Sequence, residues 1–137
     1  MAERDDLGAM FARATRRLIA EERPILERHG LTMWEYIALS HLGAGPAPSQ
    51  LGLAEAIGYD KTRLIALLER LQDAGLVARE PDPGDRRARI VRITADGTRR
   101  LRAARRDIRR MEARVLRALA PDEREMLLAV LPRLTAG

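Results

Sequence analysis

Cysteine is absent from this sequence of 137 residues, and aromatic residues are rare, with one Phe, one Trp and two Tyr. The absence of cysteine excludes a disulfide scaffold, a thiolate zinc site and a thiol-based redox switch. The scarcity of aromatic rings argues against a protein that binds single-stranded DNA or RNA by stacking bases on an aromatic platform. A chain of this length suits one domain and can bury a real hydrophobic core.

Residues that carry catalytic or metal chemistry are also sparse. The sequence has two histidines, His29 and His41. It shows no Ser/His/Asp arrangement for nucleophilic catalysis, no phosphate-binding glycine loop and no cluster of metal ligands. Glu21 and Glu22 are adjacent on a predicted helix and point in different directions, so they do not indicate a carboxylate pair. We therefore expect no enzymatic activity, no cofactor and no metal.

Long apolar runs are missing as well. None approaches the roughly 18 residues of a membrane span. Residues 1–6 lack the basic and then apolar pattern of a signal peptide. We expect a cytoplasmic protein with no membrane partner.

Basic residues are what the sequence has in excess. Lys and Arg number 25 against 20 Asp and Glu, which gives a net charge of +5. Lys61 is the only lysine, so 24 of the 25 basic residues are arginine. A chain this basic favours a polyanionic partner such as nucleic acid.

Apolar residues recur at steps of three and four, which predicts a mainly α-helical chain. Asp5 or Asp6 can cap the first helix, Pro24 is expected to kink or restart it, and Gly30 to end it. Thr32 opens the second helix with a capping box. The predicted helices run from residue 7 to the stop at Gly30 and over residues 32–42, 50–57, 61–74, 94–118 and 121–134.

The third and fourth predicted helices fit a helix-turn-helix over residues 50–71. That geometry needs a small residue where the helices approach, a turn residue able to take positive φ, and an apolar inward face on the second helix. Ala54 is the small residue, Gly58 is the turn residue, and four leucines between residues 64 and 71 face inward. Residues 61–63 are then left outside, at the helix end that contacts base edges in the major groove. Any short amphipathic helix pair is the alternative interpretation.

A β-hairpin is predicted directly after this motif, from strands at residues 76–80 and 88–93 around a turn-rich loop. Three arginines lie at or near its tip, namely Arg86, Arg87 and Arg89. Arginine suits insertion into a narrow minor groove, and we expect Asp85 to orient one guanidinium through a charge-assisted hydrogen bond. A solvated charged turn is the alternative. Helix-turn-helix and hairpin together predict a winged helix.

These residues resemble the MarR family of bacterial winged-helix regulators. The run Gly75-Leu76-Val77, then Asp85-Arg86-Arg87, then Ile93-Thr94-Ala95-Asp96-Gly97 matches the family's "GLV…DRR…LT..G" pattern in order and spacing. Leu31-Thr32 at the second helix and Pro121-Asp122-Glu123-Arg124 at the last helix also fit. The resemblance therefore covers nearly the whole chain.

The resemblance implies one MarR-type domain over residues 1–137 that forms an obligate homodimer. Residues 5–42 and 99–137 would supply the dimerisation helices, and residues 46–98 the winged DNA-binding lobe. A sensing mechanism that uses an N-terminal cysteine, found in one branch of the family, is excluded. Independently of the family, the first and last helices carry more apolar surface than a small lobe needs, which also favours a dimer.

The resemblance also implies roles for particular residues. The helix after Asp60 becomes the recognition helix, and Asp85 and Arg87 become the wing pair, with Arg87 in the minor groove. Ile65 and Ala66 depart from the polar or basic pattern of the family, so base readout would rest on fewer side chains or on a thymine methyl. The expected DNA-binding residues are Ser49, Gln50, Asp60, Lys61, Thr62, Arg63, Ala66, Asp85, Arg86, Arg87 and Arg89.

The predicted long helix carries nine arginines over residues 99–117 against two acidic residues. One interpretation is contact with the DNA backbone near the lobe, strongest for Arg99 and Arg100. The other is a solvated face that pairs with acids on neighbouring helices. The apolar seam of this helix, from Leu101 to Ala118, is narrow and suits packing against another helix.

Many members of the family bind a small aromatic or phenolic anion between the dimer base and the DNA lobe. The candidates for such a ligand site here are Met10, Phe11, Met33, Trp34, Tyr36 and His41. Trp34, Tyr36 and His41 combine apolar area with a polar group, whereas core packing is the alternative role for all six.

The sequence thus predicts a sequence-specific regulator of transcription that binds double-stranded DNA at a pseudo-palindromic operator. The favoured mode is repression relieved by a small aromatic or amphipathic ligand that stabilises a dimer mis-spaced for the operator. A ligand-independent regulator, a nonspecific architectural DNA binder and a winged helix used for protein–protein contact remain alternatives.

Overall fold

A computed structural model describes residues 3–136 and consists mainly of helices with one antiparallel hairpin. The predicted fold class, a winged helix-turn-helix lobe flanked by N- and C-terminal helices, is confirmed. In chain order the elements are α1 (Leu7–Arg28), α2 (Met33–Ala44), α3 (Gln50–Ile57), α4 (Lys61–Asp73), β1 (Val77–Asp82), β2 (Asp85–Ile93), α5 (Ala95–Val115), the 3₁₀ helix η1 (Leu116–Ala118) and α6 (Pro121–Thr135).

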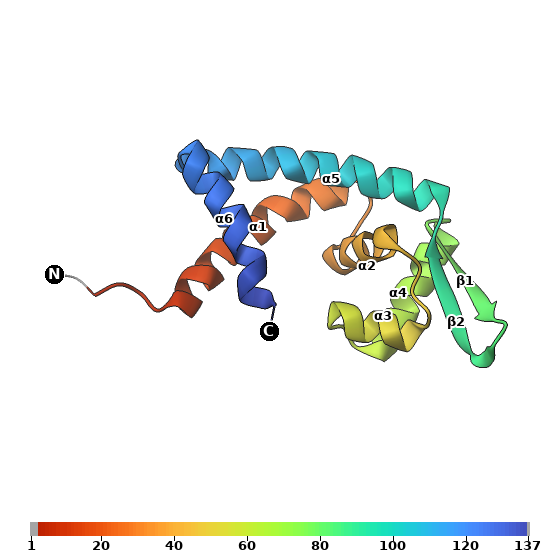
Figure 1. Ribbon diagram of the computed structural model, residues 1–137. Coiled ribbons are helices and arrows are strands. Elements are labelled where there is room, and N and C mark those ends of the chain that lie inside the picture. The colour runs from red at the N-terminus through yellow and green to blue at the C-terminus, as the bar shows by residue number, and fades with distance from the viewer. Residues whose placement is uncertain (1–2, 137) are drawn as a thin grey trace.

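The elements separate into two ends of an elongated molecule (Figure 1). Helix α5 runs along one side, and α2, α3, α4 and the hairpin lie beneath its first half. Helix α6 and the first part of α1 lie at the other end, where both termini are found. No helix within residues 3–136 is long and apolar enough to cross a membrane.

Side-chain caps define where the helices begin. Thr32 Oγ1 accepts from the Glu35 amide, and the Glu35 carboxylate accepts from the Thr32 amide, so the predicted capping box is confirmed. Ser49, Asp60 and Thr94 likewise cap α3, α4 and α5. These side chains satisfy amides that a helix leaves without partners.

The first helix differs from its prediction at Pro24, and the fifth differs in length. Helix α1 passes through Pro24 without interruption, so the predicted restart is wrong, and it ends at Arg28, just before Gly30 with its φ of 69°, as predicted. Ile25 and Leu26, which follow Pro24, are buried. Their packing holds the last turn of α1 in place. Helix α5 ends at Val115 and not near Ala118, because a 3₁₀ turn follows it.

The hairpin is longer than predicted, because its turn contains two residues and not a six-residue loop. Asp82 pairs with Asp85 across Pro83-Gly84, and the Gly84 amide donates to Asp82 Oδ1. Pro81 pairs with Arg89 beside a bulge, a position that proline tolerates in a two-stranded ribbon. Arg86 and Arg87 therefore lie on strand β2.

The core centres on the helix-turn-helix and on α5. Leu53 and Ala54 of α3 are buried. Leu64, Leu67, Leu68 and Leu71 of α4 are buried as well, which confirms the predicted inward face of the second helix. Gly58 has a φ of 72°, so the turn between these helices uses the left-handed conformation that favours glycine. From α5, the seam residues Leu101, Ala104, Ile108 and Met111 are buried.

The root of the wing is attached to the lobe by backbone contacts on both sides. Ala47 pairs with Val91 of β2 through two hydrogen bonds of 2.9 and 3.0 Å. At Gly97 in the first turn of α5, a Cβ would stand 2.1 Å from the Leu76 carbonyl oxygen. Glycine there lets α5 approach the chain just before β1.

Candidate nucleic-acid interface

The N-terminus of α4 presents polar side chains because its other face is committed to the core. Lys61, Thr62 and Arg63 are exposed, whereas Leu64 is fully buried. The Asp60 carboxylate accepts from the Arg63 amide at 2.9 Å, so Asp60 caps the helix. On the next turn Ala66 is exposed, but Ile65 is half-buried and less available to a ligand than its sequence position suggested.

The hairpin turns one set of side chains toward α3 and α4. Asp85, Arg87 and Arg89 lie in and beside the stretch of β2 where the register with β1 shifts. These three residues, with Ala88, line a cavity of about 300 Å³ together with Ser49, Gln50, Leu51 and Lys61. Arg86 is exposed but is not among the lining residues.

This cavity, which we call the wing groove, joins three elements that are separated in sequence. It brings together six of the predicted residues, Ser49, Gln50, Lys61, Asp85, Arg87 and Arg89. Asp60, Thr62, Arg63, Ala66 and Arg86 do not line it. Leu51 and Ala88 line the groove and were not predicted, because their apolar side chains gave no charge signal. Three cationic side chains against one carboxylate suit a phosphate or a base edge.

Asp85 does not orient an arginine side chain, and that expectation is wrong. Its Oδ1 accepts from the Arg87 backbone amide at 2.9 Å. Among residues 3–136, no arginine nitrogen lies within ion-pair distance of the Asp85 carboxylate. Asp85 thus fixes the backbone after the turn and leaves the Arg87 guanidinium available to DNA.

The arginines of α5 form pairs mainly within their own helix, whereas one of the two interpretations had paired them with acids on neighbouring helices. Arg99 pairs with Asp96, Arg109 with Glu112 at 2.8 Å and Arg110 with Asp107 at 3.5 Å. Arg100 has a structural contact, because its Nη1 donates to the His29 carbonyl oxygen at 3.1 Å. Each exposed pair contributes little to stability.

The six predicted ligand residues do not line one cavity within the protomer. Met33, Trp34 and Tyr36 pack against the core, and the Trp34 ring stacks on Tyr59 with centroids 4.3 Å apart. His41 is exposed. Met10 and Phe11 line a separate apolar cavity of about 260 Å³ near the start of α1.

Another cavity, of about 250 Å³, lies between the second half of α1 and the start of α2. Its lining residues are Arg23, Leu26, Glu27, Leu31, Thr32 and Met33. Met33 is the only one that the sequence singled out as a ligand residue. Arg23 and Glu27 lay outside that prediction because they resemble ordinary surface charges of an amphipathic helix.

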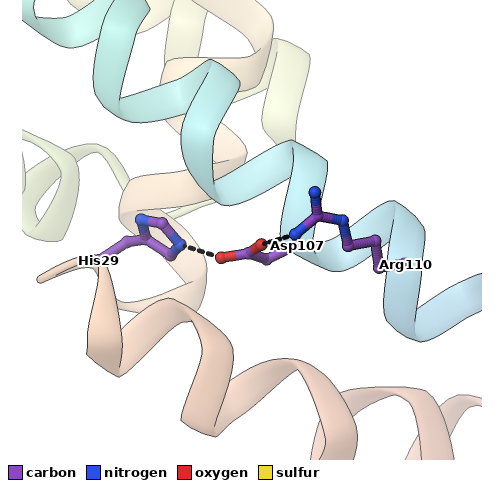
Figure 2. Close-up of polar contacts among 3 residues, drawn as sticks. All are labelled: His29, Asp107 and Arg110. Carbon is purple, nitrogen blue, oxygen red and sulfur yellow. Dashed lines mark hydrogen bonds and ion pairs between the residues drawn. The ribbon is translucent and has the colours of Figure 1, made fainter.

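His29 links the end of α1 to the middle of α5 (Figure 2). Its Nε2 lies 2.7 Å from Asp107 Oδ2, and the other oxygen of Asp107 accepts from Arg110. The hydrogen bond from His29 has the largest effect and lowers the pKa of Asp107. Desolvation opposes it, and the charges of His29, Arg110 and Arg28 lower the pKa further. The sequence had not paired these residues.

Acid is therefore expected to weaken the His29–Asp107 link. A carboxyl group whose pKa is depressed by folding stabilises the fold above its unfolded value of about 3.9, and this contribution is lost as the pH falls through the lower folded value. We expect wild type to exceed Asp107→Asn in free energy of unfolding at pH 6 and to lose that advantage below about pH 4. Urea unfolding of both proteins at each pH measures this difference in free energy of unfolding.

The control for this measurement is Asp73→Asn, which removes an exposed carboxylate from the end of α4. It reports the effect of changing the net charge alone. A difference between wild type and Asp107→Asn that stays constant from pH 6 to pH 3 would contradict the assignment.

The pKa of Glu22 on α1 is shifted in the opposite direction from that of Asp107. Partial burial, and then the charge of Glu112 on α5, raise the pKa of Glu22 above its ordinary value. Helices α1 and α5 pack against each other, so the acidic neighbour of Glu22 is on another helix and is not Glu21. The ionised form of Glu22 thus works against the contact between these helices at neutral pH.

Comparisons with known proteins agree with this geometry. A model of the MarR family matches residues 29–88. A probable transcriptional regulator from Pseudomonas aeruginosa is 32% identical, with 95% of this chain and 97% of that chain covered and a TM-score of 0.77. The transcriptional repressor CouR, bound to a 23-mer DNA duplex, is 28% identical, with 98% and 99% covered and a TM-score of 0.84. A MarR family protein of Mycobacterium tuberculosis in complex with p-aminosalicylic acid is 27% identical, with 96% and 100% covered and a TM-score of 0.81.

The fold and the arginine-bearing hairpin define a winged helix-turn-helix regulator of transcription. The chain belongs to the MarR family, as its sequence pattern implied. Regulators of this family are DNA-binding proteins and not enzymes.

Proposed function

We propose that this protein is a sequence-specific repressor that binds a pseudo-palindromic operator in double-stranded DNA as a homodimer. The observation that carries the proposal is the wing groove, where Lys61 at the start of α4 lies across from Arg87 and Arg89 of β2. Helix α4 would read the major groove, and Arg87 would enter the adjacent minor groove. The relative CouR is bound to a 23-mer DNA duplex, which supports double-stranded DNA as the partner.

The dimer would form through α1 and α6, which we assign to dimerisation segments at residues 5–42 and 99–137, with residues 46–98 as the DNA-binding lobe. Apolar side chains at this end of the protomer are exposed, among them Leu7, Phe11, Met126, Leu128 and Leu134. A two-fold dimer would cover them and place two α4 helices about 34–36 Å apart, one turn of DNA.

A small ligand would relieve repression. The cavity between α1 and α2 has room for a compound of one ring and offers the Arg23 guanidinium to an acidic group and Glu27 to a donor. The relative bound to p-aminosalicylic acid supports an aromatic acid as the ligand class. Such a ligand acts only if it binds better to a dimer whose α4 helices are mis-spaced for the operator.

Selection of duplexes from a random library at moderate ionic strength tests the proposal. We expect enrichment of an inverted repeat whose half-sites are one helical turn apart. Affinity should fall steeply with salt, by about one log–log unit per phosphate contact. Absence of any preferred duplex would overturn sequence-specific binding. The selected operator is then titrated with and without p-aminosalicylate, and an unchanged affinity would favour a ligand-independent regulator.

A further inference from the structure

Arg79 is a half-buried arginine of β1 that the sequence pattern did not single out. Its guanidinium bridges two glutamines on two different helices. Nε donates to Gln72 Oε1 at 2.7 Å, and Nη1 donates to Gln50 Oε1 at 3.1 Å. Gln50 is the first residue of α3 and Gln72 the last but one of α4. One side chain therefore connects the wing to both helices of the helix-turn-helix.

The chemistry of this bridge fixes the orientation of the Gln50 carboxamide. A guanidinium has only donors, so the glutamine group that faces it must be the carbonyl oxygen. The Gln50 amino group is consequently turned away from Arg79. Gln50 also lines the wing groove, beside Ser49 and Lys61. An amino group presented there is a donor suited to a phosphate oxygen or a base acceptor.

The bridge also acts on the direction of the hairpin. Arg79 pairs in register with Val91, and Arg87 lies four residues from Val91 toward the turn. Val91 is tied to Ala47 on the other edge of β2. The Arg79 bridge and the Ala47 pairing hold the hairpin root from two sides, so a small movement of the root would displace Arg87.

We infer that Arg79 is a positioning residue of the DNA-binding surface, which sets the place of Arg87 and turns the Gln50 amino group toward the duplex. The inference rests on the proposed function, because it presumes that the wing groove receives DNA. Arg79 itself need not touch the duplex. Its planar guanidinium holds two acceptors in fixed directions, which the compact, rotatable ammonium group of lysine does not.

The experiment measures affinity of the full-length protein for the selected operator, with thermal stability measured alongside. Arg79→Ala is expected to weaken binding about 10- to 100-fold, as when a residue that orients a binding group is lost. Arg79→Lys keeps the charge and should restore only part of that loss. Arg109→Ala removes an exposed arginine of α5 and should stay within about twofold, because distant exposed charges are screened.

A merely structural role is separated from positioning by coupling to Arg87. If Arg79 acts by placing Arg87, then Arg87→Ala lowers operator affinity less in the Arg79→Ala background than in wild type. Additive losses, full rescue by lysine, or wild-type affinity in Arg79→Ala would each overturn the inference. If Arg79→Ala fails to fold, Gln72→Ala carries the same coupling test. Failure of wild type to bind any duplex would instead refute the proposed function.

Discussion

Replacing Arg87 with alanine is expected to nearly abolish operator binding while leaving the dimer intact. A specific arginine contact to DNA is worth about 1–3 kcal/mol, and a dimer loses two of them. The combined loss of about 2–6 kcal/mol corresponds to a fall in affinity of about 30-fold to more than 10⁴-fold. The physical reason is that the Arg87 guanidinium faces the wing groove and has no acidic partner within the described chain to withdraw it. Mobility-shift titration against the operator measures the loss.

The matched control is Arg86→Ala on the adjacent position of β2. It removes the same charge from the same strand, but Arg86 does not line the groove. We expect a clearly smaller loss of affinity for Arg86→Ala. Equal losses for the two variants would show that the wing contributes only general positive charge and that the assignment of Arg87 is wrong.

Leu134→Glu is expected to convert the dimer into monomers and thereby to remove tight operator binding. Leu134 is 66% exposed in the protomer, although it is a large apolar residue on α6. In a two-fold interface a glutamate there would bury two unpaired charges, each at a cost of several kcal/mol. Without the linked second half-site, affinity should fall by about 10²- to 10⁴-fold. Light scattering and operator titration measure the two effects.

Leu134→Met keeps the apolar volume and is the control for this substitution, because exchanges of similar size are tolerated best. It should remain dimeric and bind the operator as wild type does. A Leu134→Glu protein that stays dimeric at micromolar concentration would place the interface elsewhere on the surface.

The helix-turn-helix could be predicted because its signals are local. Ser49 and Asp60 each cap a helix by accepting from an amide three residues later, so both helix starts are visible in the sequence. Gly58 marks the turn between the two helices. The wing was predicted from two strand-like runs around a turn-rich loop, and the family pattern around Asp85 and Arg87 agreed with it. The length of the wing was missed because Pro81 and Pro83 favoured a loop, whereas a bulge and a two-residue turn accommodate them within the ribbon.

The contacts between distant elements could not be predicted. Gln50, Gln72 and Arg79 are separated in sequence, and each alone resembles a surface residue of its element. The same holds for His29 and Asp107, which meet only because α1 packs on α5. The apolar face of α6 was predicted, but α6 has no buried residue, and the proposed dimer is what would cover this face.

Helix α5 is unbroken over 21 residues from the root of the wing to the end of the molecule where the chain termini lie. At 1.5 Å per residue it is about 32 Å long, and it acts as a lever arm. A tilt of about 10° at one end carries the other by about 5 Å, which exceeds the rise of about 3.4 Å between successive base pairs. In the proposed complex, a small tilt of α5 at the end that bears the chain termini would therefore shift the wing by more than one base-pair step of the operator.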